Sequence, residues 1–89
     1  MLRYTVRTDK KFDKQLSKIG EDNADRIRRW IIDNLEGSTN PKKLGKALAG
    51  RKRREWRWRV GNYRIMGEVL ERELIILLLE VGHRREVYK

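Results

Sequence analysis

The sequence predicts an α+β domain: an N-terminal strand, a two-helix hairpin and then an antiparallel three-stranded meander, with the helices on one face of the sheet. Three observations predict this class. Polar and apolar residues alternate at the start of the chain and again in its second half, apolar residues recur at helical spacing between these segments, and short turns separate the later ones. With 89 residues, the chain has room for one domain, residues 1–89.

The first strand and the first helix are predicted from two different spacings of apolar residues. Apolar residues alternate with polar ones, as in a half-buried strand, at Leu2, Tyr4 and Val6. The helix is predicted from apolar residues at i, i+4 and i+7: Phe12, Leu16 and Ile19. Thr8 or Asp9 can cap its beginning, and Gly20 suits its end.

A second helix completes the helical hairpin. Asp22 or Asn23 can cap it, and residues 37–41, which include glycine and proline, end it. Its apolar residues form one stripe: Ile27, Trp30, Ile31 and Leu35. Residues 42–48 are expected to add a short turn of helix with its two leucines directed inward.

The last three strands form the antiparallel meander. A two-residue turn at residues 61–62 joins an alternating segment, residues 56–60, to another, residues 63–69. After a second turn, residues 74–79 are apolar at every position, as expected for an interior strand covered on both faces. Residues 81–82 are expected to end this strand.

Positive charge is concentrated in the second half of the chain. The net charge is +10, and the segment from Lys42 to Arg64 holds ten basic residues and one acidic residue, Glu55. Such a segment attracts a polyanion: RNA, DNA, an anionic lipid or an acidic protein.

Composition argues against other classes of function. The chain has no cysteine and one histidine, so we expect no disulfide, no metal and no cofactor. The first residues alternate instead of forming an apolar signal core, and the longest apolar run is too short to cross a bilayer. We therefore expect a cytoplasmic protein that does not act in a membrane.

Counting outward from the hairpin turn places three arginines on one sheet face. The predicted pairing sets Arg59 opposite Arg64 and Arg57 opposite Met66. Like charges directly opposite one another weaken a sheet by roughly a few tenths of a kcal/mol. The cluster therefore indicates an anion site, and the alternative is a solvated sheet face. The tryptophans of this hairpin alternate with the arginines and are expected in the core rather than stacked on bases.

The C-terminal segment holds candidates for proton transfer. Cleaving RNA without a metal needs a base for the 2′-hydroxyl proton, cations around the phosphorane-like charge and an acid for the departing 5′-oxygen. Histidine, tyrosine and arginine can fill these roles, and the segment offers His83, Arg84 and Tyr88.

Residues 56–65 and 79–88 resemble the RelE branch of the RelE/ParE toxin superfamily, and the resemblance covers essentially the whole chain. It implies the toxin of a type II toxin–antitoxin system, a ribosome-dependent endoribonuclease that cuts messenger RNA in the A site without a metal and leaves a 2′,3′-cyclic phosphate. The firmest matches to the family's site are Arg64, Arg84 and Tyr88. Arg57 takes the place of one second-strand lysine, and Glu55, or Arg59 in a shifted register, takes the place of the other.

The resemblance implies a role for each candidate. Arg64 and Arg84 would clamp the scissile phosphate while Arg57 and Arg59 hold flanking phosphates. Because arginine stays protonated, Tyr88 or His83 would act as the base, and Tyr88 is the first choice. A further basic group is expected to bind the RNA backbone, or else to be a solvated surface: Lys46, Arg51, Lys52, Arg53 and Arg54.

The resemblance also implies partners and leaves two alternatives. A RelB-like antitoxin would cover the helices and the basic groove, forming a heteromeric complex with a toxin that is monomeric alone. The other partner would be the ribosome with messenger RNA in its A site. The alternatives are a ParE-like inhibitor of DNA gyrase without nuclease activity, and a non-catalytic RNA- or DNA-binding module.

Overall fold

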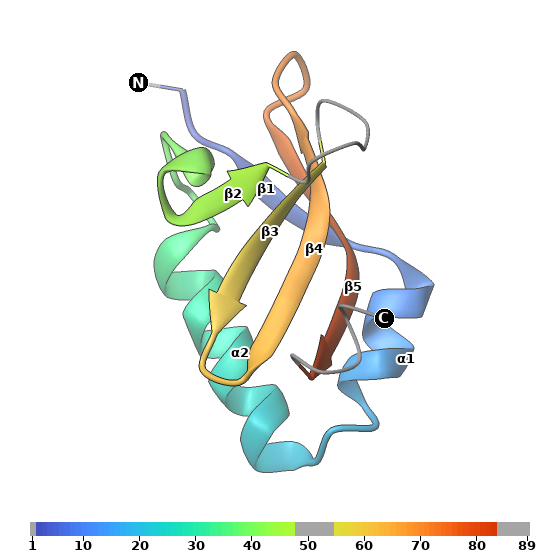
Figure 1. Cartoon of the computed structure of the whole chain (residues 1–89). Helices are drawn as coiled ribbons and strands as arrows, with labels where there is room; N and C mark the ends of the chain where they lie inside the picture. The colour runs from blue at the N-terminus through green and yellow to red at the C-terminus, as the bar shows by residue number, and fades with distance from the viewer. Residues whose placement is uncertain (1, 48–54, 84–89) are drawn as a thin grey trace.

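The computed structural model describes residues 2–47 and 55–83, which form two α-helices and a five-stranded sheet (Figure 1). The elements in chain order are β1 (Thr5–Thr8), α1 (Lys10–Leu16), α2 (Glu21–Asn34), the 3-10 turn η1 (Pro41–Leu44), β2 (Gly45–Ala47), β3 (Glu55–Val60), β4 (Tyr63–Leu70) and β5 (Ile75–His83). Neither helix is long and apolar enough to cross a membrane within these described ranges.

The strands lie in the order β1-β5-β4-β3-β2. Strands β3, β4 and β5 form the predicted antiparallel meander, and β2 adds to β3 in the same sense. Strand β1 pairs with β5 in parallel, so the sheet is mixed rather than wholly antiparallel. The α+β class and the interior position of β5 are confirmed. Figure 1 shows α2 behind the sheet and α1 beside β5.

The core lies between the helices and one face of the sheet. Its largest fully buried side chains come from both layers: Phe12, Ile27, Leu35, Trp58, Ile65, Ile76 and Leu78. Along β5, Ile76 and Leu78 are buried, whereas Ile75, Leu77 and Leu79 on the other face are half-buried. Burying each large apolar side chain stabilises the fold by about 1.5–3 kcal/mol, so the helical stripes are held against the sheet.

The segment after α2 differs from the expectation of a helical turn over residues 42–48. A 3-10 turn ends at Leu44, which is 52% exposed rather than directed inward, and β2 follows. The indole Nε1 of Trp58 donates a hydrogen bond to the carbonyl oxygen of Pro41 at 2.9 Å. A Cβ on Gly45 would lie 2.7 Å from the same Nε1, so only glycine lets the chain pass this close. Contacts with Trp58 therefore override local helix preference.

Helix boundaries also differ from the sequence-based expectation. Helix α1 begins after Asp9, as expected, but ends at Leu16 rather than near Ile19. Helix α2 is preceded by Gly20, whose φ of 91° belongs to a region that favours glycine, and not by Asp22 or Asn23. The glycine thus opens the second helix instead of closing the first.

Strand β5 begins one residue later than expected and extends past its expected end. Leu74 lies in the preceding turn with φ 57°, and β5 continues to His83, past residues 81–82. The extension follows from the length of β4, whose first residue, Tyr63, pairs with His83.

The outer edge of β1 is covered by the segment that follows α2. The backbone amide of Val6 donates to the carboxylate of Glu36, 3.1 Å from its nearer oxygen. Tyr4 exchanges two backbone hydrogen bonds of 2.8 Å with this segment, accepting from Gly37 and donating to Ser38. These contacts satisfy edge groups that another strand could otherwise pair with.

Candidate nucleic-acid interface

The β3–β4 hairpin has the predicted register. Arg59 pairs with Arg64 and Arg57 pairs with Met66, so the three arginines share one face of the sheet. Gly61, in the turn, has φ 59°, a conformation that glycine adopts without strain. Trp58 alternates with the arginines and is fully buried on the opposite face. Packing of the tryptophan thus fixes which face carries the arginines.

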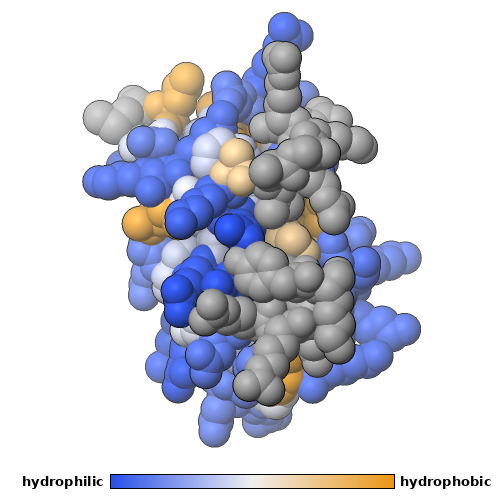
Figure 2. Space-filling view, in the orientation of Figure 1, coloured by the Kyte–Doolittle hydropathy of each residue, from blue (hydrophilic) through white to orange (hydrophobic). Residues whose placement is uncertain are grey.

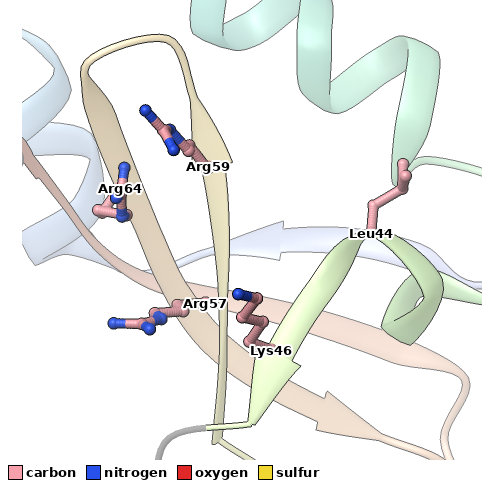
Figure 3. Close-up of a pocket in the computed structure, with 5 residues that line it drawn as sticks. All are labelled: Leu44, Lys46, Arg57, Arg59 and Arg64. Carbon is pink, nitrogen blue, oxygen red and sulfur yellow. The ribbon is translucent and has the colours of Figure 1, made fainter.

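A basic pocket forms on this face. It has a volume of about 170 Å³ and is lined by Leu44, Lys46, Arg57, Arg59 and Arg64. Four of its five lining residues are cationic, and Lys46 arrives from β2, where it pairs with Arg57. Figure 3 shows Arg59 and Arg64 near the hairpin turn, Arg57 farther along β3, Lys46 on the neighbouring strand β2, and the Leu44 side chain pointing away from the arginines. The pocket gathers positive charge from three neighbouring strands.

The basic residues differ in how firmly they are held. Arg64 is 6% exposed and is the one charged side chain that is buried in the described part of the chain. Arg59 is exposed, and its Nε lies 3.5 Å from the carbonyl oxygen of Gly61, a long hydrogen bond. A buried guanidinium has few alternative positions, so Arg64 offers a fixed charge at the pocket while Arg59 can adjust to a ligand.

His83 lies on the other side of the sheet. It pairs with Tyr63, and the two rings meet edge-on with centroids 5.6 Å apart. Both residues line a second hollow that also includes Lys18 and Ile19, the residues that follow α1. Because side chains directly opposite one another share a face, His83 points toward the helices and not toward Arg64. The structure therefore does not bring His83 together with the arginines, as the sequence reasoning expected.

The chain matches a protein-family model over almost its whole length. The model described as the ParE toxin of the type II toxin–antitoxin system parDE matches residues 2–88. The chain belongs to the ParE toxin family. None of the curated protein sequences matches this toxin.

Solved structures place the toxin in the wider RelE/ParE superfamily. It matches a chain of the RelBE2 toxin–antitoxin complex from Mycobacterium tuberculosis with a TM-score of 0.81 and 24% identity, over 93% of this chain and 100% of that one. A chain of the RelB–RelE complex from Methanococcus jannaschii is 32% identical, with a TM-score of 0.70, over 92% and 94%. The isolated RelE toxin of E. coli is 20% identical, with a TM-score of 0.70, over 96% and 90%.

Several predicted site residues of the toxin lie outside the described residues: Arg51, Lys52, Arg53, Arg54, Arg84 and Tyr88. Their roles stay predictions. Figure 2 shows a hydrophilic area over the central strands among the described residues.

The three tryptophans of the toxin pack as expected. Trp58 is fully buried, and Trp30 and Trp56 are partly buried against the core. The ammonium group of Lys42 lies 5.3 Å from the centroid of the Trp56 ring. Their contacts are therefore those of core residues rather than of stacking platforms for bases.

The sequence predicts Lys46 as a residue that binds the RNA backbone, but it does not predict the strand that brings Lys46 to the pocket. Gly45 pairs with Trp58, and Ala47 pairs with Trp56, so small residues face large ones across the two strands. The sequence signal for this strand is a lysine with a small residue on each side. A pattern of only three residues cannot be distinguished from a turn.

Proposed function

We propose that this type II toxin is a metal-independent endoribonuclease of the RelE kind, which cleaves messenger RNA in the ribosomal A site and leaves a 2′,3′-cyclic phosphate. The observation that carries the proposal is the pocket in which Lys46, Arg57, Arg59 and Arg64 converge on one sheet face. A cluster of cations suits a phosphodiester whose negative charge grows as the 2′-oxygen attacks phosphorus.

In this proposal the arginines stabilise the negative charge of the phosphates, and they do not transfer protons. Arg64, held by its burial, contacts the scissile phosphate together with Arg84, while Arg57 and Arg59 bind flanking phosphates. Removing one such contact in a transition state typically lowers a rate by about 10²–10³. Arginine remains protonated at working pH, so the 2′-hydroxyl proton needs another acceptor.

Tyr88 is the proposed group for proton transfer. The face that carries the arginines is the face opposite His83, which leaves Tyr88 as the candidate from the C-terminal segment. Attack of the 2′-oxygen forms the cyclic phosphate and breaks the bond to the 5′-oxygen, which takes up a proton as it departs.

A second candidate function is inhibition of DNA gyrase without nuclease activity. The observation that favours it is the family model itself, which describes the ParE toxin and spans residues 2–88. In this case the basic pocket would bind a partner surface or DNA, and no proton transfer would be needed.

We further propose a RelB-like antitoxin as partner. The solved complexes from M. tuberculosis and M. jannaschii each contain an antitoxin beside their toxin. An acidic segment of such a partner would be attracted to the ten basic residues between Lys42 and Arg64, and by binding there it would block access to RNA. A site of action on cytoplasmic ribosomes gives the toxin a cytoplasmic location.

A translation reaction tests the proposal. Purified toxin is added to ribosomes that translate a defined message, and the new 5′ ends of the message are mapped. The comparison includes Tyr88→Phe, Arg59→Gln and, as a control, Arg26→Gln on the exposed side of α2. We expect A-site cuts with wild type and the control, and weak or absent cuts with the two site variants. An intact message, together with loss of gyrase supercoiling activity, would replace this proposal with the second candidate.

A further inference from the structure

We infer that Lys42 and Glu71 are positioning residues of the basic pocket, because their ion pair holds η1 where β2 can place Lys46 beside the arginines. Neither residue of this pair lines the pocket, so the pocket alone suggests no role for them. The inference rests on the proposed function, since it concerns how the site of that function keeps its shape. It adds two residues, and a direction of effect, that the family resemblance does not imply.

The strand that carries Lys46 is short and lies at the end of the sheet. β2 has three residues, Gly45–Ala47, and pairs with β3. An edge strand of this length makes few backbone hydrogen bonds, and segments with few such contacts open at a low cost in free energy. The position of Lys46 therefore depends on what holds η1, which leads into β2 without a break.

The two tryptophans of β3 hold η1 and β2 together. Trp58 pairs with Gly45, and its indole donates a hydrogen bond of 2.9 Å to the carbonyl oxygen of the first residue of η1. Trp56 pairs with Ala47, and its ring centroid lies 5.3 Å from the ammonium nitrogen of Lys42. Each tryptophan thus contacts one residue of η1 and pairs with one residue of β2, so a shift of η1 would also move β2.

Lys42 joins these elements to a further segment. Its ammonium group forms an ion pair with the carboxylate of Glu71, which lies 29 residues away in the turn between β4 and β5. The side chain of Lys42 is 36% exposed and that of Glu71 is 61% exposed, so water and salt weaken their attraction. An ion pair of this exposure changes an equilibrium by a factor of roughly 1.4–5. Such a factor is enough to shift a three-residue strand without unfolding the domain.

The sign of the effect separates positioning from simple charge. The toxin has a net charge of +10, and removal of an acidic residue makes it more positive. Long-range attraction alone would let Glu71→Gln bind a polyanion as tightly as wild type or more tightly. If Glu71 instead holds Lys46 in place, the same change weakens binding. Glu73, an exposed residue of the same turn, provides the matched control, because Glu73→Gln removes the same charge and leaves the ion pair intact.

Two measurements on the full-length toxin test the inference. Binding of a fluorescent single-stranded DNA, which lacks the 2′-hydroxyl and is not cleaved, is followed by anisotropy at low salt. Hydrogen exchange of the β2 amides is followed by NMR. The variants are Glu71→Gln, Glu73→Gln, Lys42→Met, Lys46→Gln and the double variant Lys46→Gln/Glu71→Gln.

In Glu71→Gln we expect affinity for the DNA to fall about two- to fivefold and the β2 amides to exchange faster by about the same factor. Lys42→Met loses the ion pair and the contact of its cation with Trp56, so it should speed exchange at least as much. Glu73→Gln should keep the wild-type exchange and bind the DNA at least as tightly as wild type. In the double variant, Glu71→Gln should add no loss of affinity to that of Lys46→Gln, because the ion pair acts through this lysine.

Three results would overturn the inference. The first is wild-type exchange of the β2 amides in Glu71→Gln or in Lys42→Met, and the second is a DNA affinity of Glu71→Gln equal to or above that of wild type. The third is an equal loss of affinity on replacing Glu71 with and without Lys46 present. Failure of the proposed function gives a different result: exchange and DNA binding would follow the expected pattern while messages on ribosomes stayed uncut.

Discussion

Arg59 and Arg64 lie directly opposite each other on adjacent strands, although both carry a full positive charge. Such pairs weaken a sheet, and Arg64 adds the cost of burying a guanidinium. Neither contributes to the core, which Trp58 and Ile65 supply from the other face. The cost of this pair to stability therefore supports the proposal that the two arginines bind an anion.

Replacing Arg59 should separate stability from activity. In Arg59→Thr the like-charge pair is lost and threonine favours strands, so the free energy of unfolding should stay equal or rise by about 0.2–1 kcal/mol. Cleavage of ribosome-bound message should fall at least about tenfold because a phosphate contact is lost. Urea unfolding and single-turnover cleavage measure the two effects. Arg7→Thr, an exposed arginine of β1, is the matched control and should keep the wild-type rate.

Gly45→Ala should damage both the fold and the pocket. Its Cβ would lie 2.7 Å from the Nε1 of Trp58, so β2 must move away from β3. Overpacking of this kind costs about 1–3 kcal/mol. Thermal unfolding should show this loss of stability, and affinity for a short single-stranded DNA should drop because Lys46, which lines the basic pocket, moves with β2. Unchanged affinity would mean that the position of β2 does not matter to the pocket.

His83→Gln should leave cleavage close to wild type. The side chain packs edge-on against Tyr63 on the helix-facing side and does not reach the arginine face. Single-turnover cleavage on ribosomes provides the measurement, with Tyr88→Phe as the comparison that should lose activity. A large loss of cleavage in His83→Gln with normal stability would restore histidine as the proton-transfer group.

Glu36→Ala should expose the edge of β1. The carboxylate accepts the backbone hydrogen bond of Val6, and its loss leaves that amide to solvent or to another chain. We expect the free energy of unfolding to fall by about 0.5–1.5 kcal/mol. Self-association should increase, as measured by light scattering against protein concentration. Asp33→Ala, at an exposed position near the end of α2, is the control, and it should change neither quantity appreciably.

The elements in which apolar residues recur at a regular spacing could be predicted from the sequence. The alternation around Trp58 was long enough to fix the hairpin register, and with it the face that carries Arg57, Arg59 and Arg64. The helical stripes likewise identified Phe12, Ile27 and Ile31 as core residues.

The remaining features depend on contacts between distant segments. Strand β2 exists because Gly45 fits against Trp58, and three residues carry no usable period. The side on which His83 lies depends on how far β5 extends, which is set by its pairing with Tyr63. The parallel placement of β1 beside β5 likewise leaves no local signal.

The pairing of Thr5 with Ile75 joins the beginning of the chain to its last described strand. During synthesis, β1 emerges from the ribosome first and has to wait for β5 before it gains a neighbour, since β5 is the strand it pairs with. Contacts so distant in sequence form slowly, after the entropy of closing a long loop has been lost. A nascent toxin thus completes its sheet only after β5 has been translated and can pair with β1.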